Sequence, residues 1–374
     1  MQYRKNKYGE PISVLGFGCM RFARKGTGID LEEAEREILH AVELGVNYFD
    51  TAYVYPGSEA ALGKILSRNP IRDKINIATK LPQYLVKTRA AVDRYFNEEL
   101  SRLQMDHVDY YLMHMLTDIS EWERLKKLGI EEWITRKKES GQIRNIGFSF
   151  HGNTEMFLKI LDAYDWDFCQ IQYNYMDENT QAGRTGLQAA ADKGIPVIIM
   201  EPLKGGKLTD KLPASVKELW DNAPVKRTPA EWGLRWVANH PEVMCILSGM
   251  SNPEQLAENL RIMDQAQPNS LTEEELAIID KASAEYNKLI QYSCTECRYC
   301  MPCPKKIDIP DNISYYNEWF LYDGNPKVKA DFFTFTIEGR RASACVACKA
   351  CEEKCPQHLP IAEIMAKTAD LFEK

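Results

Sequence analysis

The chain has 374 residues, of which 44% are hydrophobic and 27% are charged, and its formal net charge is −7. Domains usually hold roughly 100–200 residues, so this length excludes a single small module and allows one large domain with a small one. The composition excludes disordered and fibrous proteins. Because no segment concentrates Lys and Arg, we expect no nucleic-acid partner.

The hydropathy pattern is that of a protein without a membrane anchor. The first ten residues, MQYRKNKYGE, contain no apolar stretch of the kind found in secretion signals. Apolar runs such as residues 195–200 are far shorter than the ~18 residues that suggest a membrane span. We therefore expect a cytoplasmic protein with no membrane partner.

Short apolar runs alternate with segments of helical periodicity over most of the chain. The apolar runs cover residues 12–17, 46–50, 75–79, 108–113, 143–148, 168–172, 196–200 and 243–248. The helical segments include residues 31–44, 89–103, 131–139, 186–193, 229–239 and 253–263. Continuous apolar runs are typical of parallel strands buried on both faces, and eight strand–helix units in about 270 residues are typical of a (β/α)8 TIM barrel.

A doubly wound open sheet would show the same alternation of strands and helices. Gly16-Phe17-Gly18 lies at the end of the first run, but the third glycine of the dinucleotide-binding fingerprint does not follow it. An open Rossmann sheet would normally carry this fingerprint after an early strand. We therefore predict an α/β fold with a TIM barrel over residues 1–287. A charged helix over 272–289 then leads into a cysteine-rich tail, which we predict to be a small ferredoxin-like domain over residues 288–374.

Four polar residues lie at or just after the ends of three neighbouring apolar runs: Asp50, Tyr55, Lys80 and His114. In a TIM barrel these ends meet at the C-terminal mouth, where catalytic residues lie. Taken singly, each residue is more often a helix cap, a packing residue or a solvated charge. Taken together they predict acid catalysis of carbonyl reduction, because Lys80, oriented by Asp50, can lower the pKa of Tyr55 so that it donates a proton.

At these residues the chain resembles the aldo-keto reductase superfamily, whose catalytic tetrad is Asp, Tyr, Lys and His in this order. The resemblance covers about residues 1–270 and includes Leu15-Gly16-Phe17-Gly18, Gly147-Phe148-Ser149, Gln170 to Asn174, Pro202 to Gly206 and Glu258-Asn259-Leu260. It implies hydride transfer from a nicotinamide cofactor to a small aldehyde or ketone, or the reverse from an alcohol. Tyr55 would be the general acid, and His114 would orient the carbonyl oxygen.

The same resemblance implies a set of cofactor contacts across the barrel mouth. Ser149 and Gln170 would bind the nicotinamide carboxamide, residues 203–206 would lie near the pyrophosphate, and Glu258 and Asn259 would face the adenine. The whole implied set is Gly18, Ser149, Gln170, Met200, Leu203, Gly205, Gln255, Glu258 and Asn259.

Several positions depart from the family's usual pattern. Phe150 stands in place of a common Asn, and Met200 in place of the Tyr that stacks on the nicotinamide. Gly249 and Gln255 stand where many members have the Lys and Arg that hold the 2′-phosphate. A site without these cations binds the additional phosphate weakly, so both NADPH and NADH are candidate cofactors.

Eight of the eleven cysteines lie in two runs near the C-terminus. The first run is Cys294, Cys297, Cys300 and Cys303, and the second is Cys345, Cys348, Cys351 and Cys355. Clustered cysteines in a cytoplasmic chain indicate metal binding rather than disulfides. The second run has the C-x2-C-x2-C-x3-C-P spacing of bacterial ferredoxins, and the first is one residue shorter before its last cysteine. Zinc is the alternative for any C-x2-C pair, but zinc ribbons usually combine two separated pairs, so we predict two [4Fe–4S] clusters.

Two-cluster ferredoxins, which the tail resembles, exchange the last cysteine of each run. This implies that Cys303 joins the cluster of the second run and that Cys355 joins the cluster of the first. We expect the aromatic residues between the runs to dock the tail on the barrel, although a redox partner protein could use the same surface. An alternative function is therefore a redox-responsive electron-transfer or interaction protein whose barrel turns over little.

Overall fold

The structure is a computed structural model that describes residues 1–209, 212–294, 300–355 and 357–374. It divides into two compact units, one made of residues 1–208 and 227–272 and the other of residues 209–226 and 273–374. Within the described ranges, no helix combines the length and the apolar character needed to cross a membrane.

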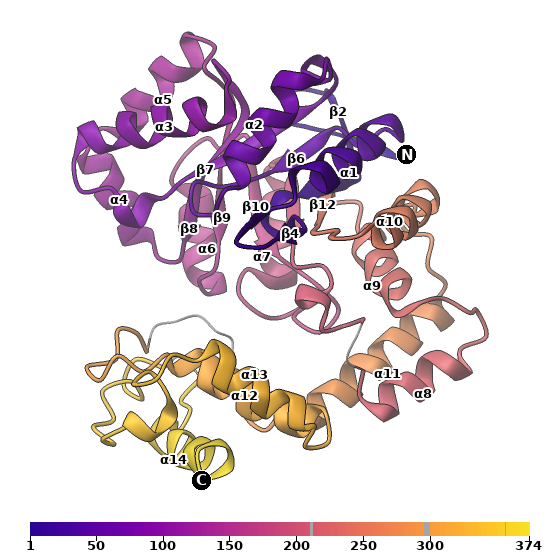
Figure 1. Ribbon diagram of the computed structural model, residues 1–374, viewed down its shortest axis with the longest axis vertical. Coiled ribbons are helices and arrows are strands. Elements are labelled where there is room, and N and C mark those ends of the chain that lie inside the picture. Colours follow the sequence, from indigo (N-terminus) through magenta and orange to yellow (C-terminus); the bar gives the residue numbers. More distant parts are fainter. Residues whose placement is uncertain (210–211, 295–299, 356) are drawn as a thin grey trace. The chain divides into compact units, whose positions relative to one another are not determined.

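In the described part of the first unit, eight parallel strands close into a barrel (Figure 1). Their order around the barrel is β3 (Leu15–Gly18), β6 (Tyr48–Asp50), β7 (Asn76–Leu81), β8 (Val108–Leu116), β9 (Ile143–Phe150), β10 (Phe168–Gln172), β11 (Val197–Met200) and β12 (Val243–Ser248). Each strand overlaps one of the predicted apolar runs. The TIM barrel prediction is confirmed, and the open sheet is excluded.

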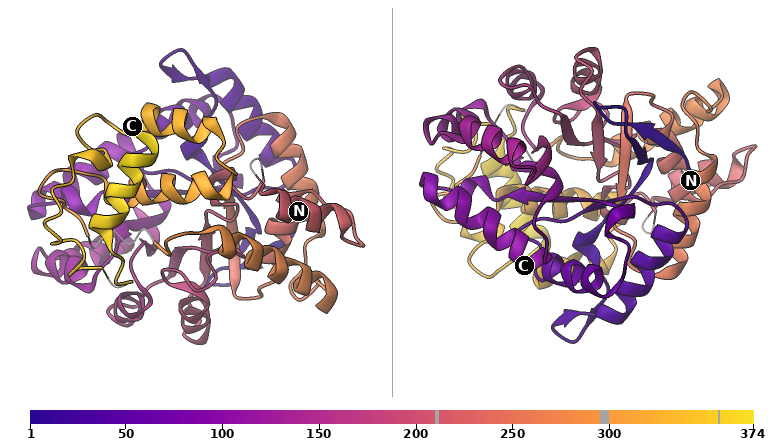
Figure 2. Two further views of the ribbon diagram at one scale, coloured as in Figure 1. Left: turned by 90° about the horizontal axis from the view of Figure 1, so that it is seen from below. Right: turned by 90° about the horizontal axis from the view of Figure 1, so that it is seen from above.

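Helices surround these strands (Figure 2). They are α1 (Leu31–Glu43), α2 (Ser58–Arg68), α3 (Arg89–Leu103), α4 (Ile119–Lys127), α5 (Ile130–Glu139), α6 (Thr154–Asp162), α7 (Gly183–Asp192), α9 (Pro229–Ala238) and α10 (Pro253–Gln265). An antiparallel pair, β4 (Arg24–Lys25) and β5 (Gly28–Ile29), precedes α1. The apolar faces of these helices pack on the strands, which leaves the strand ends to form the site.

An N-terminal hairpin covers the end of the barrel opposite the strand C-termini. Strands β1 (Tyr3–Lys5) and β2 (Pro11–Ser13) pair antiparallel just before β3, and Ile12 lies in the barrel core. The guanidinium of Arg4 donates hydrogen bonds to the carbonyl oxygens of Ala238, His240 and Val243. These bonds join the N-terminal hairpin to the last residue of α9, to the loop after it and to the start of β12.

Glu37 makes the stability of the barrel unit depend on pH. Its side chain lies on the buried face of α1, and neither carboxyl oxygen has a hydrogen-bond partner among the described residues. Burial, together with the charge of Glu33, raises the pKa of Glu37 from 4.5 to about 7. The folded protein therefore holds this proton more tightly than the unfolded chain, and the resulting stability is lost as the pH rises through 7.

We expect Glu37→Gln to raise the free energy of unfolding by about 1 kcal/mol at pH 8 and by much less at pH 5. Glutamine keeps the shape of the side chain but carries no charge at either pH. Denaturant unfolding at the two pH values measures the difference. An equal gain at both pH values would show that ionisation of Glu37 does not limit stability.

The second unit is helical in its described part. Its helices are α8 (Ala214–Asn222), α11 (Glu273–Leu289), α12 (Ile309–Leu321), α13 (Pro326–Phe335) and α14 (Ile361–Phe372). Helix α11 packs on α8 and α12, and it buries Ile279, Ala282 and Tyr286. This apolar face places α11 in the second unit, whose longer segment starts at Glu273.

The aromatic residues between the two cysteine runs form a core within the second unit. The rings of Phe332 and Phe372 stack at a centroid distance of 4.8 Å, and Trp319 contacts Phe372 edge-on at 5.7 Å. Tyr315 packs edge-on against Phe332. Tyr315, Trp319 and Phe332 thus join α12, α13 and α14 to one another. Phe320 and Phe333, from the same segment, are exposed.

Candidate functional site

Three neighbouring strands bring the four predicted catalytic residues to the barrel mouth. Asp50 is the last residue of β6, Lys80 lies one residue before the end of β7, and His114 lies near the end of β8. Tyr55 follows in the loop between β6 and α2. Because the strands are adjacent and parallel, their side chains converge at the same end of the barrel.

Asp50 and Lys80 form a buried ion pair. Lys80 Nζ donates a hydrogen bond to Asp50 Oδ1 and a second, 2.7 Å long, to the carbonyl oxygen of Thr51. The two residues are 3% and 1% exposed. Burial lowers the pKa of Lys80, but the negative charge of Asp50, together with the interaction with the Tyr55 hydroxyl, outweighs burial and raises it. The amine is therefore a fixed positive charge beneath the mouth of the barrel.

Tyr55 lies directly beside this charge. Lys80 Nζ is 5.1 Å from the centre of the Tyr55 ring, and the ring of His114 meets the Tyr55 ring edge-on at 6.1 Å. Burial raises the pKa of Tyr55, while the charge and hydrogen bond of Lys80 lower it, and the net pKa is raised. The phenol is thus protonated at neutral pH and faces a cation that stabilises its ionised form.

The loop that carries Tyr55 is held by α3. The guanidinium of Arg102 lies 4.1 Å from the centre of the Tyr53 ring and donates a hydrogen bond to the Tyr53 carbonyl oxygen. The Tyr53 hydroxyl donates to Glu98, and Arg102 also pairs with Glu59 at the start of α2. These contacts fix the loop on both sides of Tyr55.

A β-bulge in β8 presents His114. The register between β8 and β9 shifts between Met113 and Leu116, and Met115 has a positive φ of 55°. The Met115 N–H donates to the hydroxyl of Ser149 on β9 at 2.8 Å. The predicted apolar run ends at residue 113, whereas the strand continues through the bulge to Leu116. The bulge is tolerated because the N–H that it removes from the strand pairing has a side-chain partner.

His114 is neutral at physiological pH. Burial, followed by the charges of Lys80 and His151, lowers its pKa well below the ordinary value. Its Nδ1 atom is buried and has no hydrogen-bond partner in the described part of the chain. A neutral imidazole can donate one hydrogen bond to a carbonyl oxygen without giving up its proton.

Ser149 and Gln170, the two residues assigned to the nicotinamide carboxamide, lie side by side. They are paired in register on β9 and β10 and are 1% and 2% exposed. Gln170 Nε2 donates a 2.9 Å hydrogen bond to Asp50 Oδ2. Gln170 thus contacts the Asp50–Lys80 pair, which its assigned role does not require.

The remaining predicted cofactor residues surround the mouth on β3, β11 and the loop after β11. Gly18 ends β3, where a Cβ would lie only 3.3 Å from the carbonyl oxygen of Ser248. Met200 ends β11 and packs against the barrel core. Leu203 precedes a 3-10 turn over Lys204–Gly206, in which Gly205 has a positive φ of 66°.

Helix α10 carries three more residues of the predicted set. Gln255 is exposed and accepts a hydrogen bond from the backbone N–H of Ser251. Glu258 accepts a hydrogen bond from Thr228, and the buried Asn259 donates one to Ser248 at the end of β12. Asn259 therefore also fixes α10 on the barrel strand that precedes it.

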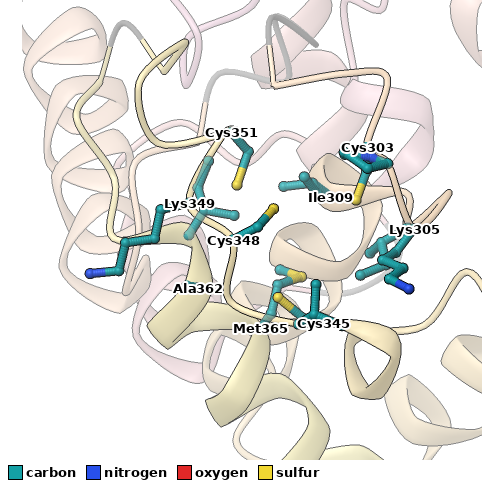
Figure 3. Close-up of a pocket in the computed structure, with 13 residues that line it drawn as sticks. Cys303, Lys305, Ile309, Cys345, Cys348, Lys349, Cys351, Ala362 and Met365 are labelled. Atoms are coloured by element: carbon teal, nitrogen blue, oxygen red, sulfur yellow. The ribbon is translucent and has the colours of Figure 1, made fainter.

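In the second unit, four cysteines line one pocket (Figure 3). Cys345, Cys348 and Cys351 come from the second run, and Cys303 comes from the first. Among the described residues, no three His, Cys, Asp or Glu side chains are close enough to hold a single metal ion. Four thiols around one pocket are the donor set that a [4Fe–4S] cluster takes.

The other cysteines of the two runs lie near the same apolar core. Cys294, Cys300 and Cys355 pack against the cluster of Ile307, Ile309 and Ile313 that also supports Cys303. Cys297, the remaining predicted ligand, lies outside the described residues. The three cysteines of the barrel, Cys19, Cys169 and Cys245, are buried.

Two known families match this chain, one over the barrel and one over the cysteine-rich tail. Residues 14–284 match the aldo/keto reductase family, and residues 293–359 match the 4Fe-4S dicluster domain. The chain belongs to the aldo/keto reductase family. It is therefore an oxidoreductase with a TIM barrel and a C-terminal 4Fe-4S domain, which confirms the resemblance and the enzyme class predicted from sequence.

Relatives of this aldo/keto reductase match about three quarters of its chain. An aldo-keto reductase of Mycolicibacterium vanbaalenii is 29% identical over 72% of this chain and 87% of the relative. An L-galactose dehydrogenase of Arabidopsis thaliana is 26% identical over 73% of this chain and 91% of the relative. The holo form of an aldo-keto reductase from Bacillus halodurans has a TM-score of 0.63 and 26% identity, covering 75% of this chain and 96% of that structure.

Arg21 is a cation at the mouth of this reductase that the sequence analysis missed. It follows β3 and donates a 3.3 Å hydrogen bond to the Gly205 carbonyl oxygen, and a Cβ on Gly249 would lie 3.1 Å from its Cδ. It thus lies against the loops that follow β11 and β12. The sequence feature that could have indicated Arg21 is its position in Gly18-Cys19-Met20-Arg21, directly after the first barrel strand. That position by itself does not show which loops Arg21 contacts.

Proposed function

We propose that this protein reduces aldehydes or ketones with a nicotinamide cofactor, and oxidises the corresponding alcohols, with Tyr55 as the general acid. The observation that supports this most directly is the buried Asp50–Lys80 pair beneath Tyr55, with a neutral His114 at the edge of the same ring. An acid, a fixed cation and a hydrogen-bond donor are what a carbonyl oxygen needs when it gains negative charge.

The proton and the hydride have separate sources in this proposal. A bound reduced nicotinamide would supply the hydride to the carbonyl carbon. Tyr55 gives its proton to the carbonyl oxygen, and the resulting phenolate is stabilised by Lys80. His114 donates a hydrogen bond to the same oxygen and orients it. In alcohol oxidation Tyr55 acts as the base, so the rate in that direction should rise with pH, because burial raises its pKa.

The residues at the mouth suit a nicotinamide dinucleotide. Ser149 and Gln170 would hold the carboxamide, and the backbone at Leu203 and Gly205 would lie near the phosphates. Lys204 is held by Asp177 through contacts of 2.8 Å, so it is not a simple replacement for the absent phosphate cations. Arg21 has no carboxylate partner in the described ranges and is the cation that we assign to the phosphates.

We expect Arg21→Gln to weaken binding of both NADPH and NADH by about 10–100-fold, the usual loss of one charge-assisted hydrogen bond. Equilibrium titration of nucleotide fluorescence measures this loss. Arg24→Gln, in the exposed β4 strand of the same segment, is the matched control and should bind both nucleotides normally. Unchanged affinity in Arg21→Gln would move the phosphate site elsewhere.

The pocket of the second unit would hold one [4Fe–4S] cluster on Cys303, Cys345, Cys348 and Cys351. A second cluster would lie on Cys294, Cys297, Cys300 and Cys355. Such clusters transfer single electrons, whereas a nicotinamide transfers a hydride, so the clusters do not take part directly in the hydride step. The roles that we propose for them are electron transfer, sensing or structural support. The apolar core on which cysteines of both runs pack would hold these cluster ligands in place.

A second candidate function follows from the same pocket: a redox-responsive electron-transfer or interaction protein whose barrel turns over little. Anaerobic assays of NADPH and NADH oxidation with a panel of small aldehydes and ketones separate the two functions. Turnover that depends on the carbonyl compound supports the reductase. Nucleotide binding without turnover of any carbonyl compound would favour the electron-transfer protein.

A further inference from the structure

The hydrogen bond between Gln170 and Asp50 crosses the interior of the barrel. Strands β6 and β10 are separated by three other strands in either direction around the barrel, so they lie opposite one another. Gln170 Nε2 nevertheless reaches Asp50 Oδ2 at 2.9 Å, between residues 120 positions apart in sequence. Both side chains are almost completely buried. This contact connects the strand assigned to the nicotinamide with the strand that leads to Tyr55.

The two oxygens of Asp50 have different partners. Oδ1 accepts a hydrogen bond from Lys80, and Oδ2 accepts one from Gln170. Each partner therefore limits how far the carboxylate can turn toward the other. A carboxylate released by Gln170 would be free to pair with the ammonium group through both oxygens, and this would draw the charge of Lys80 away from the Tyr55 hydroxyl.

The oxygen of the Gln170 amide is available to accept a hydrogen bond from a ligand. Its Oε1 accepts no hydrogen bond within the described chain, while its register neighbour Ser149 has its hydroxyl oxygen occupied by the Met115 N–H. An amide that accepts a hydrogen bond on its oxygen becomes a stronger donor through its nitrogen. A carboxamide N–H bound to Oε1 would thus strengthen the bond from Nε2 to Asp50.

We propose that Gln170 is a positioning residue that couples the bound nicotinamide to the Asp50–Lys80 pair, and through it to the acidity of Tyr55. The proposal rests on the proposed function for the identity of the cofactor. It goes beyond carboxamide binding because it assigns the opposite end of the same side chain to the proton donor. The enzyme would then have its strongest acid when the hydride donor is in place.

Other charged or titratable groups also face Tyr55, and the coupling acts in addition to them. Lys80 and Asp50 lie beneath the ring, Cys19 approaches from the end of β3, and His114 meets the ring from β8. From β9 and β10 the facing side chains are the neutral Ser149 and Gln170. His151 acts on His114 from the end of β9. Gln170 is thus the neutral group in this set that touches the ion pair directly.

The test is the ionisation of Tyr55 in Gln170→Met, whose side chain has similar length but no donor. We expect the pKa of Tyr55 to rise by up to about one unit, because the lost hydrogen bond to the Asp50 carboxylate is worth about that much and acts on Tyr55 through the ion pair. The difference in tyrosinate absorbance between each protein and its Tyr55→Phe counterpart gives this value, without and with NADPH. In wild type the pKa should fall when NADPH binds, and in Gln170→Met that fall should disappear.

Ser149→Ala is the matched control, because Ser149 is the register neighbour with the same assigned ligand but no bond to Asp50. Both variants should bind the nucleotide more weakly, and Ser149→Ala also removes the hydroxyl that accepts the Met115 N–H at the bulge of His114. Only Gln170→Met should shift the Tyr55 ionisation in the absorbance titration without nucleotide, because His114 is neutral and Ser149 has no bond to Asp50. If Gln170→Met does not fold, Gln170→Asn, whose amide is too short to reach Asp50, should give the same shift.

An unchanged Tyr55 ionisation in a folded Gln170 variant with weakened nucleotide binding would overturn the proposal and leave Gln170 as a binding residue only. Failure of the proposed function would look different. In that case wild type would show no turnover with any carbonyl compound, while the absorbance titration without nucleotide would still report whether Gln170 controls Tyr55 through Asp50.

Discussion

We expect Tyr55→Phe to lower the rate of carbonyl reduction by about 10²–10⁴-fold, the usual contribution of a general acid. The change removes one oxygen atom and leaves the ring that contacts His114. The affinity for the nucleotide should remain nearly the same, because the hydroxyl is needed only as negative charge develops on the carbonyl oxygen. Steady-state kinetics, combined with nucleotide titration of the same protein, measures both quantities.

Tyr53→Phe is the matched control for this experiment. It makes the same chemical change two residues away, where the hydroxyl bonds to Glu98 instead of facing Lys80. We expect a loss of only a few-fold, because the Arg102 contacts to the ring and carbonyl of Tyr53 remain. Equal losses in both variants, or full activity in Tyr55→Phe, would remove Tyr55 from the role of acid.

We expect loss of Cys303 to remove the cluster bound by the second cysteine run, to which Cys303 should contribute its thiolate. Anaerobically purified wild type should contain about eight irons per chain, and Cys303→Ser about four, because loss of one thiolate removes one cluster. Iron and sulfide analysis with visible absorbance measures this loss. Cys169→Ala removes a buried barrel thiol and should retain the full iron content.

Double variants decide which cysteines share a cluster. If Cys303 and Cys345 bind the same cluster, as their common pocket suggests, the double variant should lose no more iron than either single variant. Combining Cys303→Ser with Cys294→Ser should then remove both clusters. The reverse result, with additive loss for Cys303 and Cys345, would show that each run holds its own cluster. Stoichiometric zinc in wild type would contradict both arrangements.

The architecture of the barrel and the polar residues at its strand ends were predictable from the amino-acid sequence. Buried parallel strands need continuous apolar runs, so their number and order were visible without coordinates. Asp50, Lys80 and His114 stood out because each follows such a run, and the two cysteine runs stood out because cluster ligation requires local spacing. These features depend on residues close together along the chain.

Contacts between residues far apart in sequence became visible in the folded structure. The bond from Gln170 to Asp50, the approach of Arg21 to Gly205 and Gly249, and the packing of α11 on α8 all depend on how distant segments meet. The bulge at Met115 likewise depends on a hydroxyl from the neighbouring strand. Periodicity and spacing record which face of an element is buried, whereas the partner on that face is set by closure of the barrel and by packing of the whole core.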